Sequence, residues 1–265
     1  MFEFTDVTVA YDGRLALRLS ATRFEAGTLV ALIGPNGSGK TTLLRLLAGL
    51  EKPTAGTLTR SETERSGVAY VGQRHDQHRW MPLTAGEVLK MGRYGARGLV
   101  GRLDSADRAS ISDAAARLGV EDLLSRPFGT LSGGQQQRVL IAKALVQDAS
   151  CLLLDEPITG LDFTSQEIIL EVVGSERDRG RLVMLSTHHL DEAERCDRVL
   201  LLATSVIADG PPGQVLRAGP LSEAFGHRVL EDPDGNGAIV IDDHGHNHAH
   251  DPAAISLTSS SDFTP

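Results

Sequence analysis

The stretch that most constrains the fold of this chain runs from Thr28 to Leu50 and reads TLVALIGPNGSGKTTLLRLLAGL. A continuous apolar run leads into a glycine-rich loop and then into leucines at helical spacing, which predicts a buried strand, a loop and a helix. The loop fits the pattern G-x-x-x-x-G-K-S/T, with Gly34, Gly39, Lys40 and Thr41 at its fixed positions. The flanking strand and helix are those that the pattern requires. The stretch therefore predicts a binding site for the phosphates of a nucleoside triphosphate.

Each residue type in this loop suits phosphate binding. Glycines let the backbone turn tightly and bring its N–H groups against phosphate oxygens, which a Cβ would obstruct. The helix that begins near Lys40 adds unpaired N–H groups and the positive end of its dipole. Lys40 supplies a positive charge, and the Thr41 hydroxyl is suited to Mg²⁺. We assign nucleotide contacts to the whole loop: Gly34, Pro35, Asn36, Gly37, Ser38, Gly39, Lys40, Thr41 and Thr42.

Composition and charge narrow the class of protein. With 265 residues, 41% apolar and 23% charged, the chain suits a soluble globular protein with one large domain and a subdomain or tail. Its net charge of −9 argues against a nucleic-acid-binding protein, which would need a basic excess. Two distant cysteines suggest neither a disulfide framework nor a metal site, and they fit a reduced cytoplasmic setting. No apolar run approaches the ~18 residues needed to span a bilayer, so we expect any membrane role to come through a partner chain.

The pattern of elements predicts an α/β fold in which the central sheet is mostly parallel. Before the phosphate loop, Phe2 to Ala10 alternate apolar and polar residues, and a second strand is expected from Leu15 to Phe24, which together predict an antiparallel β subdomain. From Arg74 to Pro127 the spacing becomes helical. There, a capping box formed by Thr84 and Glu87 opens one helix, and another is expected from Ser105 to Leu118. These helices predict a helical subdomain inserted into the α/β core.

A second anion site is suggested by the sequence LSGGQ at Leu131 to Gln135. Ser132 is a good N-cap, and the run that follows it to Gln147 has helical spacing. Gly133 and Gly134 at the start of that helix leave backbone N–H groups open to an anion. The alternative is an ordinary capped helix after a loop, and this stretch alone does not separate the two.

Two carboxylates follow the apolar run Cys151 to Leu154, which predicts a central strand of the parallel sheet. Groups at the carboxyl end of such a strand face the ligand crevice. Adjacent carboxylates would be costly to bury without a cation, so Mg²⁺ is the natural partner. We expect Asp155 to hold the metal, through water, and Glu156 to orient and deprotonate the attacking water.

Two further side chains lie where predicted core strands end. Gln73 follows the short strand Gly67 to Gly72, and although a glutamine in this position is usually just solvated, it could contact a metal or the γ-phosphate. His188 follows the strand Leu182 to Ser186. A lone histidine is more often structural, but beside a phosphate site His188 can donate a hydrogen bond to the γ-phosphate.

In this order the motifs make the chain resemble the nucleotide-binding subunits of ABC transporters. GPNGSGKTT is similar to their Walker A loop, LSGGQ to the signature, LLLDEP to the Walker B strand and STHHL to the switch-histidine loop, over roughly Phe2 to Leu216. The resemblance implies a P-loop NTPase core that hydrolyses ATP with Mg²⁺, with Lys40 and Gln73 joining Glu156 and His188 as catalytic residues. It further implies Mg²⁺ contacts from Thr41, Gln73 and Asp155, and nucleotide contacts from Tyr11, Ser132, Gly133, Gly134, Gln135 and Asp162.

The family's assembly would then apply to this chain. Two subunits would associate head to tail, with each ATP between Gly34 to Thr42 of one and Ser132 to Gln135 of the other. Gln73 would transmit the change to an integral membrane permease, so that the protein would lie peripherally on the cytoplasmic face of the cell membrane. The chain departs from the family at Gly72, where proline is common, and at His189, where aspartate is common.

The segment from His78 to Arg102 resembles the ATPases of bacterial zinc and manganese importers, where MGRYG recurs. Such importers also use a periplasmic or extracellular metal-binding protein. The ATPases of iron-siderophore and haem importers carry a similar segment, so they remain an alternative. A soluble ABC ATPase, the alternative of another class, would need a long coiled-coil insertion or two cassettes in one chain, and neither is evident in the sequence.

Residues 1–220 are expected to form the ABC ATPase domain, with the helical subdomain at about 74–140. Residues 221–265 would form a hairpin and a histidine-rich tail, in which His244, His246, His248 and His250 alternate with other residues. Neutral imidazole is a good Zn²⁺ ligand, so a weak zinc-sensing or buffering site is one interpretation. A disordered tail without a metal is the other.

Overall fold

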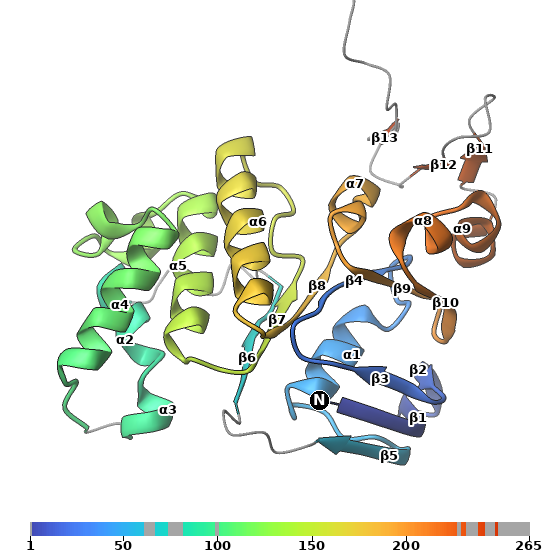
Figure 1. The fold of residues 1–265 in the computed structure, drawn as a ribbon, viewed down its shortest axis with the longest axis horizontal. Coiled ribbons are helices and arrows are strands. Elements are labelled where there is room, and N and C mark those ends of the chain that lie inside the picture. Colours follow the sequence, from blue (N-terminus) through green and yellow to red (C-terminus); the bar gives the residue numbers. More distant parts are fainter. Residues whose placement is uncertain are drawn as a thin grey trace, which may run out of the picture.

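The computed structural model describes residues 2–60, 67–73, 82–98 and 101–226, and the backbone of three short strands at 229–231, 238–241 and 247–248 (Figure 1). These three are β11 (Val229–Glu231), β12 (Ala238–Ile241) and β13 (Asn247–His248), which pair antiparallel. Between them and the main body lie the short helices α8 (Pro212–Val215) and α9 (Ala218–Phe225).

A six-stranded sheet forms the centre of the fold, in the order β10-β9-β4-β8-β7-β6. All neighbouring pairs are parallel except β10 with β9. The mostly parallel central sheet is thus confirmed. Its strands are β4 (Leu29–Ile33), β6 (Val68–Val71), β7 (Cys151–Asp155), β8 (Leu182–Ser186), β9 (Arg198–Leu202) and β10 (Val206–Gly210).

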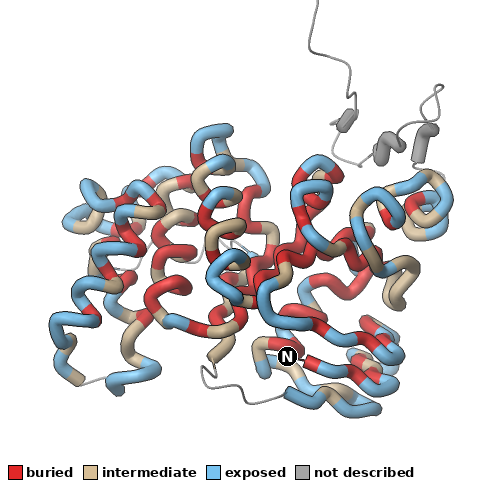
Figure 2. The backbone as a smooth tube through the Cα atoms, in the orientation of Figure 1, coloured by how far each residue is buried: buried red, intermediate tan, exposed pale blue. Residues whose placement is uncertain are grey.

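Alternate residues of these strands enter two separate hydrophobic cores, one on each face of the sheet. Within β4, Ala31 and Ile33 pack into the core on one face, whereas Val30 and Leu32 pack into the other. Every residue of β4, β7 and β8 is buried, as the red centre of Figure 2 shows. A strand covered on both faces has no solvated side, which explains its unbroken apolar sequence.

The core on one face lies between the central sheet and an antiparallel sheet, and helix α1 (Lys40–Leu47) packs in the same core. The strands of the antiparallel sheet are β1 (Phe2–Tyr11), β2 (Arg14–Leu19), β3 (Thr22–Phe24) and β5 (Ala55–Arg60). The antiparallel subdomain is confirmed, but the single strand expected from Leu15 to Phe24 is wrong. It is broken between β2 and β3. The residues Leu17 to Leu19 of β2 share the register of β3 on β1, and the register of β2 shifts beyond Val9 of β1. The break lies opposite Asp6, whose φ of 49° interrupts the regular extended backbone of β1.

Helices cover the opposite face and extend to one side as a helical subdomain (Figure 1). They are α2 (Ala85–Met91), α3 (Tyr94–Arg97), α4 (Ser105–Arg117), α5 (Gly133–Val146), α6 (Phe163–Asp178) and α7 (Leu190–Glu194), with 3₁₀ turns η2 (Glu121–Leu123) and η3 (Phe128–Thr130). The predicted capping box is present, because the Thr84 hydroxyl accepts from Glu87 N and the Glu87 carboxylate accepts from Thr84 N.

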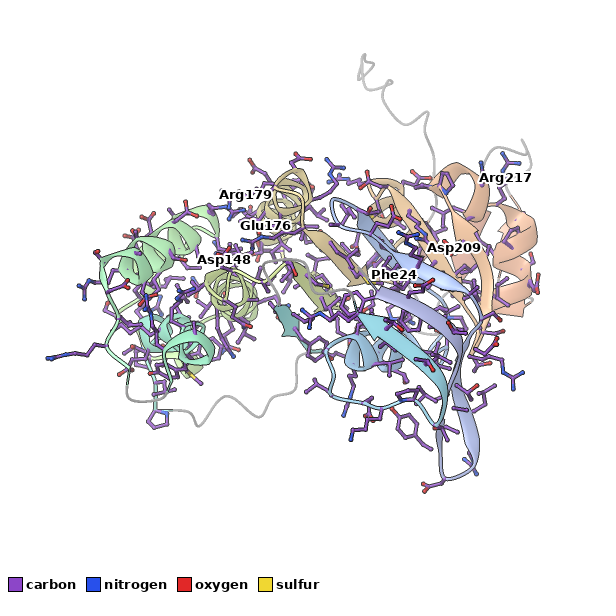
Figure 3. The ribbon with its side chains drawn as sticks, turned by 60° about the horizontal axis from the view of Figure 1, so that its bottom comes forward. Phe24, Asp148, Glu176, Arg179, Asp209 and Arg217 are labelled. Atoms are coloured by element: carbon purple, nitrogen blue, oxygen red, sulfur yellow. The ribbon has the colours of Figure 1, made fainter. Side chains whose placement is uncertain are left out.

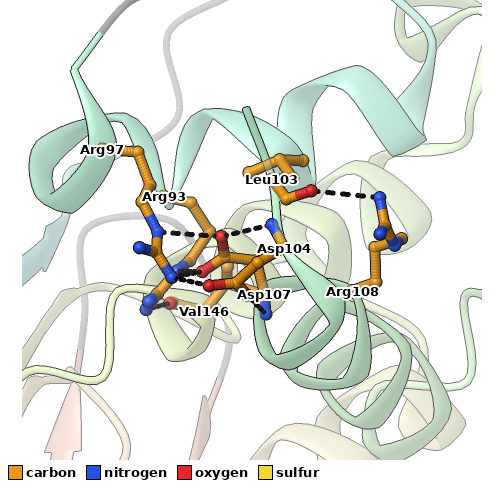
Figure 4. A network of polar contacts seen from close by, with 7 residues as sticks. All are labelled: Arg93, Arg97, Leu103, Asp104, Asp107, Arg108 and Val146. Carbon is orange, nitrogen blue, oxygen red and sulfur yellow. Dashed lines mark hydrogen bonds and ion pairs between the residues drawn. The ribbon is translucent and has the colours of Figure 1, made fainter. Parts of the chain in front are cut away.

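A buried carboxylate joins α3, α4 and α5 within the helical subdomain (Figure 4). The Asp107 side chain is inaccessible to solvent and accepts hydrogen bonds from Arg93 Nε at 2.7 Å and Arg97 Nε at 2.9 Å. Arg93 also donates to the carbonyl of Val146 at the end of α5. Desolvation by itself would raise the pKa of Asp107, but the hydrogen bonds from Asp104 N and the two arginines lower it to about 2.

A second buried carboxylate ties this subdomain to the core. Glu176 on α6 is fully buried, and Figure 3 labels it beside Arg179 and Asp148. It accepts from Arg117 of α4 at 2.5 Å and also pairs with Arg179 and with Arg181, which in turn pairs with Asp148. These contacts fix α4 against α6, so the signature helix α5, which packs against both, is held in a defined position.

Candidate nucleotide-binding and catalytic site

The loop between β4 and α1 can adopt its path only because of glycines. A Cβ at Gly34 would lie 2.0 Å from the carbonyl oxygen of Leu202, and one at Gly39 would lie 2.7 Å from that of Ala16. Gly39 also has a φ of 100° as the N-cap of α1, a conformation that side chains disfavour. The loop is therefore pressed against the neighbouring strands, and its N–H groups can face a ligand on the open side.

Lys40 and Ser38 line the inside of this loop. Lys40 is only 6% exposed, and its Nζ donates to the carbonyls of Gly34 at 2.6 Å and Pro35 at 3.1 Å. Ser38 is 2% exposed, and its hydroxyl has no hydrogen-bond partner among the described residues. A buried charge and a buried unsatisfied hydroxyl at a helix N-terminus form a donor set that fits phosphate oxygens.

The carboxyl ends of four adjacent parallel strands meet beside the loop. The order β4-β8-β7-β6 brings the phosphate loop, His188, the two carboxylates and Gln73 to one edge of the sheet. Asp155 and Ser186 are direct partners in the β7–β8 register. Groups more than a hundred residues apart in sequence are thus neighbours at the crevice where open α/β sheets bind ligands.

Glu156 contacts two of the other three predicted catalytic residues, Gln73 and His188. Its Oε2 accepts from Gln73 Nε2 at 2.9 Å, and its Oε1 lies 2.8 Å from His188 Nε2. Its φ of 50° directs the side chain away from the path of β7, and the Ser186 hydroxyl accepts from its N–H at 2.8 Å. The His188 hydrogen bond outweighs burial and, with Gln73 and the charge of Lys40, lowers the pKa of Glu156. Glu156 is therefore ionised at neutral pH and able to accept a proton.

Asp155, only 1% exposed, is held by two residues that lie outside the sequence motifs. The Ser186 hydroxyl donates to its Oδ1 at 2.6 Å, and the Tyr70 hydroxyl donates to its Oδ2 at 3.4 Å. Burial first, and then the charge of Asp155, raise the pKa of Tyr70 to about 12, so it remains a hydrogen-bond donor. Both residues belong to strands that flank β7, and a register argument between parallel strands could have identified Ser186.

Carboxylate, hydroxyl and amide oxygens are available here for a cation. Asp155, the exposed Thr41 at the start of α1 and Gln73 together offer oxygen ligands of the kind that Mg²⁺ prefers, with water completing the shell. The residues present thus fit a magnesium ion held by few protein ligands and by nucleotide phosphates.

The signature segment is built as a helix start. Ser132 and Gln135 form a capping box, with Ser132 Oγ accepting from Gln135 N at 3.3 Å and Gln135 Oε1 accepting from Ser132 N at 3.0 Å. A Cβ at Gly134 would lie 2.6 Å from Ser165 Oγ and 2.9 Å from Asp162 Oδ2. Asp162 itself caps α6 by accepting from Ser165 N. The signature and the Asp162 turn are therefore packed against each other.

The structure does not bring the signature and the phosphate loop of one chain together. Figure 1 shows α5 among the helices on one side and α1 beyond the central sheet near the antiparallel strands. A second chain would be needed to place Ser132 to Gln135 over a nucleotide in this loop.

Tyr11, at the end of β1, is 44% exposed and available for a base to stack on.

The histidines of the tail lie largely outside the described residues. This holds for His244, His246 and His250, whereas His248 is described only through the backbone of β13. Across the described ranges, no group of three or more His, Cys, Asp or Glu side chains is arranged to hold a metal ion. Part of the segment His78 to Arg102 also lies outside, namely residues 78–81, 99 and 100.

Comparison with known proteins agrees with this geometry. The family model described as ABC transporter matches residues 18–159, more than half of the 265 residues. The chain belongs to the ABC transporter family. It is an ABC ATPase, an enzyme that hydrolyses ATP with Mg²⁺. None of the helices in the described part of this ABC ATPase has both the length and the apolar character to cross a membrane.

Relatives match almost the whole ABC ATPase. The chelated iron transport system membrane protein YfeB of Yersinia pestis is 36% identical over 260 residues, 95% of this chain and 86% of that protein. The zinc transport system ATP-binding protein TroB of Treponema pallidum is 36% identical over 248 residues, 91% of this chain and 93% of that protein. Among solved structures, a dimeric post-hydrolysis state of the ATP-binding cassette MJ0796 with ADP and Pi has a TM-score of 0.69 and 26% identity, covering 80% of this chain and 99% of that chain.

Proposed function

We propose that this ABC ATPase powers the import of a divalent metal ion, zinc or manganese, as a peripheral subunit on the cytoplasmic face of the cell membrane. The observation that carries the proposal is the likeness, over more than nine tenths of the chain, to transport proteins for zinc and for chelated iron. The iron-protein relative supports import of an iron chelate as the second candidate.

The contacts at the sheet edge support the catalytic roles that we propose. Gly34 to Thr42 hold the triphosphate, and Mg²⁺ held by Thr41, Gln73 and Asp155 would neutralise charge on the phosphates. Glu156 accepts a proton from the attacking water. The oxygen of that water forms a bond to the γ-phosphorus, and the bond between the γ-phosphorus and the oxygen that leaves with ADP breaks. His188, 2.8 Å from Glu156 and able to donate to the γ-phosphate, orients both groups.

Two kinds of partner complete the proposal. The first is a second copy of the chain, because α5, which begins in the signature, lies apart from α1, which begins in the phosphate loop, and the dimeric solved relative supports this arrangement. The second is an integral membrane permease, reached through Gln73, whose side chain contacts Glu156 at the catalytic edge. A periplasmic or extracellular metal-binding protein would deliver the ion indirectly, and no nucleic acid is involved.

The import proposal can be tested by deleting the gene and measuring cellular metals by mass spectrometry during growth under metal limitation. We expect loss of zinc or manganese accumulation, restored by the wild-type gene but not by a Glu156→Gln version. A deficit confined to iron supplied as a chelate would support the second candidate instead. Unchanged zinc, manganese and chelated iron would contradict both.

We further propose that the tail binds Zn²⁺ through His244, His246, His248 and His250, because alternating imidazoles can share one ion. Calorimetry on metal-free full-length protein is expected to show weak Zn²⁺ binding that disappears when residues 244–250 are deleted. ATP hydrolysis by the deletion variant should match the wild type. Unchanged Zn²⁺ binding would show that these histidines are not the ligands.

A further inference from the structure

Glu192 on α7 is a buried carboxyl that the catalytic roles above leave unused. It is 7% exposed and lies with Leu29, Leu185 and Cys196 along a groove between α6 and α7. Burial raises its pKa to about 7, partly opposed by a hydrogen bond from Thr187. The groove also contains the charged residues Arg177 and Arg195, but burying a carboxyl is costly unless a partner stabilises it. Its one side-chain hydrogen bond within the described residues is therefore the feature to explain.

That hydrogen bond fixes the residue before His188. The Thr187 hydroxyl donates to Glu192 Oε2 and accepts from the N–H of His189 at 3.0 Å. The N–H of Thr187 donates to the carbonyl of Leu32, on the strand that leads into the phosphate loop, at 3.1 Å. Thr187 is 1% exposed. Its hydroxyl thus links the backbone on the two sides of His188 to α7, and its N–H links the same backbone to β4.

We propose that Glu192 is a positioning residue for ATP hydrolysis, which holds His188 in register with Glu156 through the Thr187 hydroxyl. The inference rests on the role proposed above for His188. The His188 ring meets Glu156 at 2.8 Å across neighbouring strands, so a small shift of its backbone would break the contact. Misplacement of a reacting group by about 1 Å can cost about a hundredfold in rate.

Single-turnover hydrolysis, with purified full-length protein in saturating excess over ATP, tests this. Glu192→Leu is expected to lower the maximal rate at least about tenfold, with ATP affinity within about twofold of the wild type. Thr187→Val, which removes the hydroxyl at constant shape, should do the same. Glu192→Gln and Thr187→Ser keep a hydrogen bond and should retain most activity. The double variant Thr187→Val with Glu192→Leu should be no slower than the slower single variant, because both remove one linkage.

Two controls distinguish failure of the role of Glu192 from failure of the role proposed for His188. Glu171→Gln changes an exposed carboxylate on the same groove and should behave as wild type. His188→Ala should abolish most hydrolysis, and if it does not, the proposed role of His188 fails. If His188→Ala is inactive while folded Thr187→Val hydrolyses ATP at the wild-type rate, the role of Glu192 is overturned. Thr187→Val is a small internal change, so the test remains decisive even if Glu192→Leu does not fold.

Discussion

Replacing Glu156 with glutamine is expected to lower steady-state ATP hydrolysis by about 10²–10⁴-fold while leaving ATP binding intact. The carboxylate is ionised at neutral pH because its hydrogen bond to His188, with smaller help from Gln73 and Lys40, lowers its pKa. Glutamine has the same shape but cannot take a proton from water. The phosphate loop is untouched, so bound ATP should persist and hold two subunits together.

Phosphate release measures the loss of hydrolysis, and light scattering with and without ATP measures the dimer. The Glu156→Gln protein should be dimeric with ATP and monomeric without it, whereas wild-type dimers should be short-lived. Glu223→Gln, the same chemical change at an exposed site on α9, serves as the matched control and should leave both readouts unchanged. Undiminished hydrolysis by folded Glu156→Gln would refute the role of this carboxylate as the base.

The residues that meet at the edge of the sheet could be predicted from the sequence. Polar residues that end a long apolar run are costly to place inside the core, so we expect them at the edge where the strand ends. Asp155 is the last residue of a strand that is buried on both faces, and Glu156 and His188 follow such strands, so all three lie where a strand leaves the core. Parallel strands end at the same edge, which brings such residues together whatever their separation in the chain. The contacts of Glu156 with Gln73 and His188 follow from this rule.

The groups that hold these residues in place could not be predicted in the same way. Ser186 and Tyr70 are ordinary strand residues by type, and only the register between strands shows that they reach Asp155. By its sequence, Glu192 would be an exposed charged residue on a short helix. The residues next to it in the sequence do not predict that it is buried and accepts a hydrogen bond from Thr187. The spacing of apolar and polar residues predicts which residues face the core, whereas these contacts depend on how separate helices and strands pack together.

The break between β2 and β3 did leave a sign in the sequence. Leu17 and Leu19 of β2 are buried at odd positions, whereas Phe24 of β3 is buried at an even position, so the alternation changes phase between them. β1 changes phase in the same way around Asp6, where the backbone turns to positive φ. The expectation of one strand from Leu15 to Phe24 was wrong because it overlooked this change of phase.

We expect ATP hydrolysis to depend on a site that is divided between two chains. Lys40→Ala should abolish hydrolysis because it removes the charge inside the phosphate loop, and Ser132→Asp should abolish it by placing a negative charge against the γ-phosphate of the partner's ATP. Aspartate is also a good N-cap, so the helix start is preserved. An equal mixture should recover about a quarter of wild-type activity, since about half of the dimers are mixed and each has one intact site of two.

The recovery is diagnostic because each variant keeps what the other lacks. In a mixed dimer, the intact phosphate loop of the Ser132→Asp chain meets the intact signature of the Lys40→Ala chain, and phosphate release over a single turnover measures that site alone. Ser132→Asn, which caps the helix without charge, should retain most activity and shows that repulsion rather than the cap causes the loss. If mixed dimers form but no activity returns, the head-to-tail site is wrong. The separation of α5 from α1 within one chain would then need another explanation, because an isolated subunit with both motifs intact leaves its signature far from its own phosphate loop.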